Sequence, residues 1–137
     1  MSISEKLSKY GFHDTELSSI DCDKTTVTLN FKDGLYLLAP NGKELNRTKP
    51  LQVIISFNEE FESLDEIFDF REFQKRKGYR IDYLSFSKYL KQETYEICDV
   101  YYSNFSNSLL FDGGFFKRDI IFTIEEITDI VFREIAE

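Results

Sequence analysis

The chain has 137 residues, a length typical of one domain, and carries 17 basic against 25 acidic residues for a net charge of −8. This balance disfavours nonspecific contact with nucleic acid or an anionic membrane, and no apolar run is long enough to span a bilayer. The chain contains 14 Phe and 8 Tyr but no Trp, a composition that favours strands over a helical bundle. Its N-terminus lacks the features of a signal peptide, so we expect one cytoplasmic domain over residues 1–137.

Turn signals divide the first half of the chain into a short helix and several strands. The helix is expected over residues 3–10, and strands over 17–22, 26–31, 35–39 and 51–57, with a loop over 41–50. Segment 26–31 is the clearest strand, because apolar and polar residues alternate along it with a period of two. Asp33-Gly34 supplies the positive φ angles of a tight turn, so strand 35–39 is expected to fold back on strand 26–31.

The second half alternates strands with one short helix. Strands are expected over 67–71 (with a helix around 64–68 as the alternative), 79–84, 95–102, 108–111 and 115–123, and a helix over 85–92 capped by Ser85 or Ser87. Lys77-Gly78 and Asp112-Gly113-Gly114 are the expected turns.

The C-terminal segment fits two interpretations. Thr123 and Glu126 form a capping-box pattern, whereas the density of β-branched residues favours a strand, which we adopt. Many short strands without regular strand–helix alternation predict a mainly β (α+β) fold. We expect an antiparallel curled sheet, a sandwich or a partial barrel, with one or two short helices.

Few residues are suited to metal or nucleophilic chemistry. His13 is the only histidine, and Cys22 and Cys98 are the only cysteines, without the spacing of a zinc site. Both cysteines fall in expected strands, where we predict reduced, buried thiols rather than a nucleophile paired with His13. His13 is expected to bond a backbone carbonyl or an acid in a turn, with Asp14 capping the following turn. A recognition role for this pair is the alternative. The chain has no phosphate-binding glycine motif, and we predict no cofactor, no metal and no catalytic residue.

Charge is distributed in blocks. Residues 59–69 hold six acids and no base, and residues 119–137 hold six acids and one base. Between them, residues 71–80 carry +4 and include Phe73 and Tyr79. That basic block suggests nucleic-acid stacking only weakly, and it fits equally well with pairing to the preceding acids. Each block is either a solvated face or a binding surface. The partner-binding candidates are Glu59, Glu60, Glu62, Asp65, Glu66, Asp69, Glu125, Glu126 and Asp129.

The segment Gly11-Phe12-His13-Asp14, together with the strand pattern that follows it, resembles the start of a loose group of small bacterial β-rich proteins. These proteins begin with a Phe/Leu-His-Asp pattern before a β-meander, and the group includes immunity proteins of polymorphic toxin systems. The resemblance covers residues 11–31 and implies a binding role.

Three functional hypotheses follow. The first is a non-catalytic protein-binding module, such as an immunity protein that occludes a basic toxin through the acidic blocks, with Tyr and Phe as anchors. The abundance of Phe supports a small-ligand-binding β domain with an aromatic-lined cavity as the alternative. The adjacent carboxylates leave a hydrolase as the third, although adjacency in sequence does not establish a catalytic geometry. A free sheet edge also offers a route to a homodimer.

Overall fold

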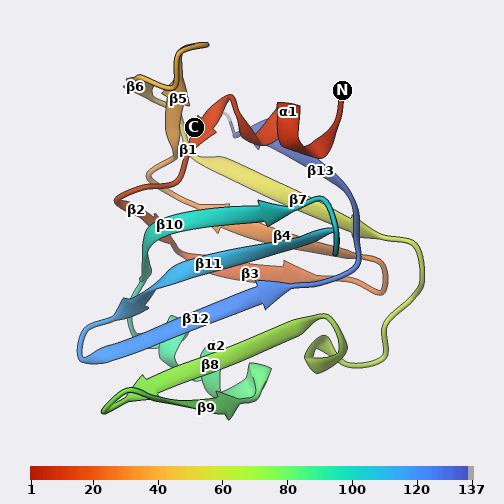
Figure 1. Ribbon diagram of the computed structural model, residues 1–137, viewed down its shortest axis with the longest axis vertical. Coiled ribbons are helices and arrows are strands. Elements are labelled where there is room, and N and C mark those ends of the chain that lie inside the picture. Colours follow the sequence, from red (N-terminus) through yellow and green to blue (C-terminus); the bar gives the residue numbers. More distant parts are fainter. Residues whose placement is uncertain (136–137) are drawn as a thin grey trace.

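The computed structural model describes residues 1–135, and in this range the chain forms three antiparallel sheets and two α-helices (Figure 1). The helices are α1 (Ile3–Leu7) and α2 (Tyr83–Gln92). The expected mainly β, α+β class is confirmed, and the two larger sheets share one core as a sandwich. Between residues 1 and 135, no helix has the length and apolar character needed to cross a membrane.

The largest sheet has six strands in the order β2-β10-β11-β12-β8-β9. These strands are β2 (Thr15–Leu17), β8 (Phe68–Gln74), β9 (Lys77–Ile81), β10 (Tyr95–Ser103), β11 (Ser108–Phe115) and β12 (Arg118–Ile124). Buried residues alternate with more exposed ones along β11 and β12, because successive side chains of a strand point to opposite faces. One face of this sheet is therefore apolar and forms one wall of the core.

The second sheet has four strands in the order β13-β7-β4-β3. These are β3 (Ser19–Cys22), β4 (Thr26–Phe31), β7 (Leu51–Phe57) and β13 (Ile127–Glu134). Strand β7 lies inside the sheet and alternates between buried and half-buried residues over its whole length. A small third sheet of β1 (Tyr10–Gly11), β5 (Tyr36–Leu38) and β6 (Glu44–Arg47) lies at the same end of the protein as α1 (Figure 1).

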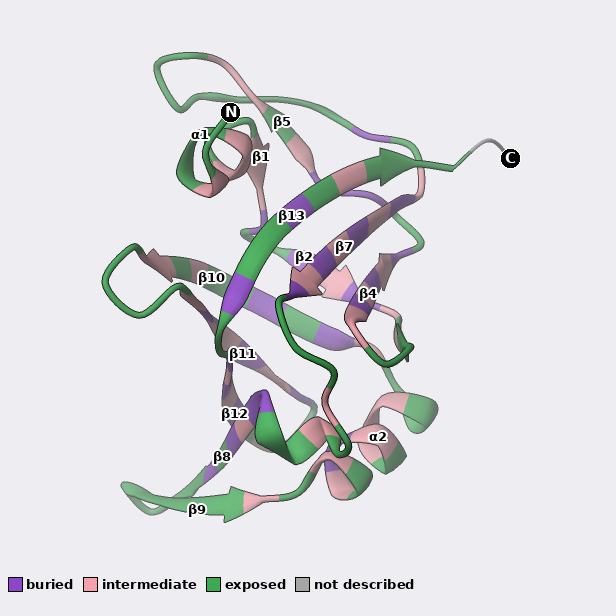
Figure 2. Ribbon diagram, turned by 90° about the vertical axis from the view of Figure 1, so that its right-hand side faces the viewer, coloured by how far each residue is buried: buried purple, intermediate pink, exposed green. Residues whose placement is uncertain are grey.

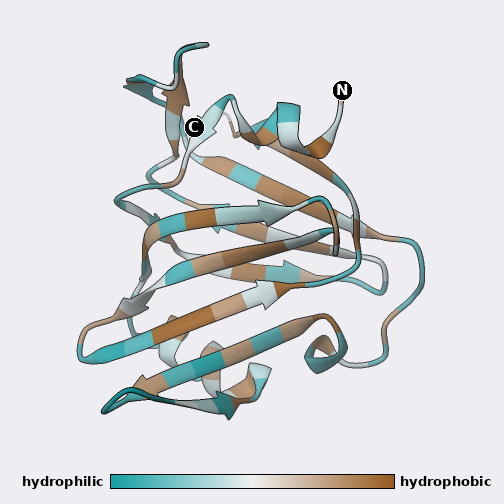
Figure 3. Ribbon diagram, in the orientation of Figure 1, coloured by the Kyte–Doolittle hydropathy of each residue, from teal (hydrophilic) through white to brown (hydrophobic). Residues whose placement is uncertain are grey.

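Aromatic side chains fill the space between the layers. The ring of Phe12 contacts Phe31 of β4 at 5.8 Å and Phe111 of β11 at 6.1 Å between centroids, so it joins the two larger sheets. Helix α2 lies beside strands β8 and β12 of the six-stranded sheet (Figure 2). Its Phe86 ring stacks on Phe70 of β8 at 4.4 Å between centroids. Strands β11 and β12, which carry strongly hydrophobic segments, lie in the interior of the six-stranded sheet (Figure 3).

Two expected turns lie elsewhere. Asp112-Gly113-Gly114 belongs to β11, and the chain turns only at residues 116–117. Both glycines permit close backbone approach: a Cβ on Gly113 would lie 2.1 Å from Glu96 O, and one on Gly114 would lie 2.4 Å from Arg118 O. Similarly, Lys77-Gly78 is part of β9, and the turn before it is at residues 75–76.

The turn at Asp33-Gly34 is present, but it does not make the expected hairpin. Strand β4 pairs with β3 and β7, whereas β5 pairs with β1 and β6 in the third sheet. Gly34 has a φ of +76° and packs on the backbone of Thr48, where a Cβ would lie 2.4 Å from Thr48 O. This contact directs the chain away from β4. The expected loop at 41–50 also contains a strand, β6.

The expected strand at 17–22 is divided between two sheets. Strand β2 pairs with β10 in the six-stranded sheet, and β3 pairs with β4 in the four-stranded one. Ser18 lies between them and donates its N–H to Asn30 O at 2.8 Å. The chain therefore changes layers at Ser18, which a continuous apolar pattern does not reveal.

The predicted cap of the second helix was wrong, while the C-terminal strand is confirmed as β13. The strand expected at 79–84 ends at Ile81 because Asp82 is the N-cap of α2, and its side chain accepts the Ser85 N–H at 2.8 Å. Asp82, rather than Ser85 or Ser87, thus begins the helix. Glu126 has a φ of +59° and lies in the turn before β13, so the capping-box pattern does not start a helix.

Candidate functional site

The first acidic block lies mainly in the connection between β7 and β8, here called the acidic connector (residues 58–67). Phe61 anchors it: the Phe61 N–H donates to Lys24 O at 3.0 Å, and its ring makes an edge contact with Phe57 at 5.6 Å. Near its end, Ser63 Oγ accepts the Asp65 N–H and caps a single 3-10 turn, η1 (Leu64–Glu66). The acids of this segment are therefore displayed from an anchored backbone.

The turn between β12 and β13 lies directly against this connector. The Glu125 N–H donates to Ile67 O at 2.8 Å, and the Ile127 N–H donates to Asn107 O at 2.9 Å. These two hydrogen bonds hold Glu126 between the connector and the β10–β11 turn. Residues far apart in sequence consequently meet at one end of the molecule.

The three segments enclose a groove of about 420 Å³, here called the acidic groove. Its carboxylates are those of Glu59, Glu60, Glu66 and Glu126, and its apolar lining comes from Phe57, Phe61, Ile67 and Ile127. The remaining lining residues are Asn58, Ser106, Asn107 and Thr128, so no basic side chain lines this part of residues 1–135. Phe57, Ile67 and Ile127 are buried and Phe61 is half-buried, so the four carboxylates are the main feature of the groove and suit a cationic ligand.

Two of the predicted acids lie outside the acidic groove, in a second groove between the acidic connector and α2. Glu62 and Asp65 line a second groove, with Tyr83 of α2 among its other lining residues. The Asp65 carboxylate accepts the Tyr83 N–H at 2.8 Å and so stabilises the first turn of α2. Asp65 therefore has a structural partner as well as an exposed position.

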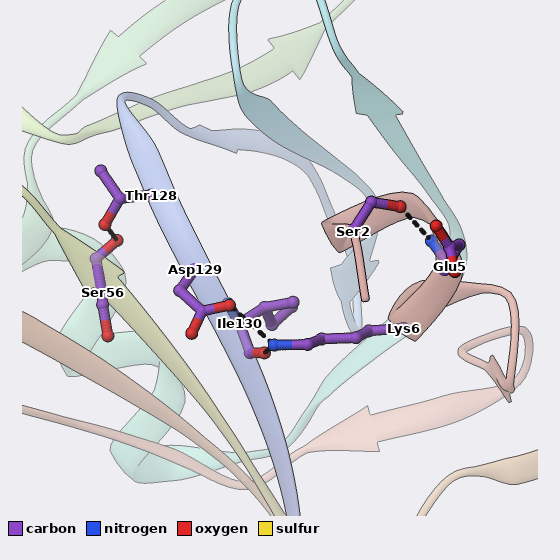
Figure 4. A network of polar contacts seen from close by, with 7 residues as sticks. All are labelled: Ser2, Glu5, Lys6, Ser56, Thr128, Asp129 and Ile130. Atoms are coloured by element: carbon purple, nitrogen blue, oxygen red, sulfur yellow. Dashed lines mark hydrogen bonds and ion pairs between the residues drawn. The ribbon is translucent and has the colours of Figure 1, made fainter.

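Asp69 and Asp129 are engaged in ion pairs. Asp69 contacts Arg71 at 3.1 Å and Arg80 at 3.8 Å, which partly bears out the pairing alternative for the basic block. Asp129 accepts from Lys6 Nζ at 2.8 Å (Figure 4), and this hydrogen bond lowers the pKa of the Asp129 carboxyl. Lys6 Nζ also donates to Ile130 O, so it occupies a carbonyl of edge strand β13.

The second acidic block does not gather at a single place. Glu125 is exposed beside the groove but does not line it. Asp119 lies on β12 and Glu134 lies on β13, and neither lines the groove. Glu137 lies outside the described residues. The structure thus brings four of the nine predicted acids together in the acidic groove and two in the second groove. It leaves Asp69, Glu125 and Asp129 outside both.

His13 and Asp14 form a clamp on a bulge of β10. His13 Nδ1–H donates to Cys98 O at 2.6 Å, and Nε2 lies 3.2 Å from the Asp14 carboxylate. The Asp14 N–H donates to Ile97 O at 3.0 Å, and the register of β10 shifts between Ile97 and Asp99. The expectation that His13 bonds a carbonyl or an acid in a turn is confirmed, because it does both.

The turn that follows His13 is closed by Thr15 rather than by Asp14. The Thr15 N–H and hydroxyl both donate to Phe12 O, at 3.1 and 2.6 Å. Asp14, at a φ of +57°, directs its carboxylate to His13. The hydrogen bond to Cys98 O, and secondly the Asp14 charge, raise the pKa of His13, since both contacts favour the imidazolium.

Both cysteines are free and exposed, so the prediction of buried thiols was wrong. Cys22 ends edge strand β3, and Cys98 occupies the β10 bulge, where neither side chain faces the core. His13 contacts the Cys98 carbonyl, with no hydrogen bond to the thiol. Partial desolvation and nearby carboxylates raise the pKa of both thiols, which disfavours the nucleophilic thiolate.

The apolar part of the groove was not anticipated from the sequence. Phe57 and Ile127 belong to strand patterns that indicate core positions, and Phe61 is a single aromatic among acids. Phe105, in the β10–β11 turn beside groove residues Ser106 and Asn107, is fully exposed. An aromatic residue at a turn is the only local signal that could have identified it.

Within residues 1–135, no group of three or more His, Cys, Asp or Glu residues is arranged to hold a metal ion. No protein-family model matches the chain, and comparisons with curated proteins and with solved structures find no significant match.

Proposed function

We propose that the protein is a non-catalytic binding module whose acidic groove receives a basic segment of a partner protein. The observation that carries this proposal is the convergence of Glu59, Glu60, Glu66 and Glu126 around one groove, to whose lining residues 1–135 contribute no basic side chain. Carboxylates gathered in this way attract a cationic surface and accelerate its association. The resemblance of residues 11–31 to immunity proteins suggests a toxin as the partner, which would be inactivated by occlusion.

Aromatic side chains at and beside the groove offer apolar contact, which complexes use for affinity. The half-buried Phe61 contributes to the lining, and the fully exposed ring of Phe105 lies on the adjacent turn. Aromatic residues are enriched among the side chains that dominate binding energy. We therefore assign Phe105 as the anchor and the four carboxylates as the groups that select and orient a basic partner.

Most of the Phe residues, whose abundance supports the small-ligand alternative, pack in the core. Phe122 stacks on Phe111 at 4.6 Å and also contacts Phe70 and Phe86, both at 5.3 Å. These rings fill the interior of the sandwich. They therefore give no specific support to an aromatic-lined ligand cavity.

The test is a calorimetric titration of the protein with the purified product of the gene adjacent to its own, at about 0.05 and about 0.3 M salt. We expect one-to-one binding that weakens with salt. The groove variant is Glu59→Gln/Glu60→Gln/Glu66→Gln/Glu126→Gln. At about 0.3–0.5 kcal/mol for each exposed carboxylate, it should bind about eight- to thirtyfold more weakly.

A matched control separates the groove from net charge. The control variant Asp33→Asn/Glu44→Gln/Asp119→Asn/Glu134→Gln removes the same number of carboxylates from exposed positions outside the groove. It should bind as the wild type does. Equal loss in both variants would show that only net charge matters, and unchanged binding by the groove variant would contradict the proposal.

The anchor is tested by Phe105→Ala, with Phe116→Ala as its control because Phe116 is also strongly exposed but lies on a different turn. The first should weaken binding and the second should not. Rescue of growth in cells that express the adjacent gene would then test the toxin assignment separately.

A further inference from the structure

A second strongly charged surface lies at the turn between β8 and β9, and it is basic. Lys75, Arg76 and Lys77 form this surface, here called the basic tip, and all three are exposed. None of them makes an ion pair within residues 1–135, whereas Arg71 and Arg80 share Asp69, and Arg118 pairs with Glu72 at 3.0 Å. The tip is also hydrophilic in Figure 3. Its three cations therefore remain available to a partner.

The backbone of the basic tip is conformationally costly for these residues. Lys75 and Arg76 have φ angles of +49° and +72°, which a two-residue hairpin turn requires. Asn-Gly is the favoured pair at such positions, because other side chains are strained at positive φ. A lysine and an arginine thus occupy positions where the turn geometry alone would favour Asn and Gly.

Exposed aromatic rings flank the basic tip. Tyr79 and Phe73 lie on the two strands of the hairpin and are 51% and 39% exposed. The two rings lie on opposite faces of the hairpin, because Phe73 pairs with Gly78 and Tyr79 pairs with Glu72. The basic tip and the acidic groove are therefore complementary in charge.

The basic tip cannot reach the acidic groove of its own molecule. The acidic connector precedes β8 and the tip follows it, and β8 is a strand of seven residues paired on both sides. At about 3.4 Å per residue this places the two surfaces roughly 20 Å or more apart, at opposite ends of the strand (Figure 1). Complementary surfaces that cannot meet within one molecule can meet between two.

We propose that the basic tip of one copy docks in the acidic groove of a second copy, so that the protein associates head to tail. This inference goes beyond the proposed function, because the occupant of the groove is another molecule of the same chain. The contact joins different surfaces of the two copies, so each complex retains one free tip and one free groove. A basic partner would compete with the tip for the groove.

The charged residues on the edge strand and the net charge of the protein favour head-to-tail docking over edge-strand pairing or nucleic-acid binding. Edge strand β9 contains Lys77 and Arg80, and lysine on an edge discourages strand-to-strand pairing. The net charge of −8 opposes a polyanion. The same charge repels a second copy at long range, but at about 0.1 M salt this repulsion is screened beyond roughly 10 Å, while contacts at the groove persist.

The experiment is sedimentation velocity over a range of protein concentrations at about 0.1 M salt. The average mass of the wild type should rise with concentration. A tip variant, Lys75→Asn/Arg76→Gly/Lys77→Gln, removes the cations and places favoured residues in the turn, so its fold should be at least as stable. The tip variant and the groove variant should each remain monomeric.

Mixing the two variants is the decisive measurement. The tip variant retains a groove and the groove variant retains a tip, so an equimolar mixture should form a heterodimer that grows no further. A wild type that stays monomeric, a tip variant that associates like the wild type, or a mixture without heterodimer would each overturn the proposal.

Two further arms identify other outcomes. In the first, the wild type binds a single-stranded oligonucleotide but does not self-associate, and the tip variant does not bind it. This result would show that the basic tip binds nucleic acid rather than a second copy of the chain. Failure of the proposed function is distinguishable, because the tip variant should still bind the basic partner while losing self-association.

Discussion

Gly113 is the position where a small substitution should have a large effect. It lies in β11, inside the six-stranded sheet, and a Cβ there would be 2.1 Å from Glu96 O and 3.1 Å from Ile97 Cα of β10. Ordinary contacts of a Cβ begin near 3.4 Å, so Gly113→Ala requires the backbone of β10 to move by more than 1 Å. Overpacking of this kind costs about 1–3 kcal/mol. In a domain of this size, that lowers the melting temperature by about 3–10 °C.

Urea and thermal unfolding followed by circular dichroism measure this loss. Gly78→Ala is the control: its Cβ would lie 3.0 Å from the Phe73 ring, which is exposed enough to turn away, so the change in unfolding free energy should be within about 0.5 kcal/mol. If Gly113→Ala were as stable as the wild type, close approach of β10 would not be the reason for a glycine at this position.

Two further predictions concern the core and the clamp. Phe122→Ala should lower the free energy of unfolding by about 3–5 kcal/mol, because its ring is fully buried among other aromatic rings, while Phe116→Ala at an exposed turn should change it by less than about 0.5 kcal/mol; equal effects in urea unfolding would contradict the assigned core. His13 should titrate above the ordinary histidine pKa of about 6.5, because Cys98 O and Asp14 favour its imidazolium, and with a single histidine the NMR titration is unambiguous. Because the pKa of His13 is raised in the folded protein, this stabilisation is complete below about pH 6.5 and is lost as the pH rises through the folded pKa. His13→Gln should therefore destabilise the protein more in acid than in alkali. A measured His13 pKa at or below about 6.5 would refute the assigned contacts of His13.

Local patterns identified most of the strands but not their partners. The alternation of apolar and polar residues at 26–31 and the apolar run at 51–57 correspond to β4 and β7. The same reasoning joined residues 17–22 into one strand, although β2 and β3 lie in different sheets. Periodicity reports which side of a strand is buried, whereas the neighbouring strand is selected by packing between distant segments.

The candidate site shows the same division. The acids at 59–69 are evident from the sequence, but the position of Glu126 beside them depends on the hydrogen bonds of Glu125 with Ile67 and of Ile127 with Asn107. Both bonds connect residues far apart in the chain. No local pattern predicts them, and none separates Asp69 and Asp129, which are paired, from the acids of the groove.

By itself, the sequence determined the mainly β class, the positions of the clearest strands and the order of acidic and basic blocks, because these depend on composition and on the period of neighbouring residues. The tertiary structure alone decided that Gly113 and Gly114 lie within a crowded strand rather than in a turn, and that four carboxylates share one groove. These features arise from contacts between segments that are distant in the chain, and they depend on sheet order, register and layer packing, which short-range patterns do not encode.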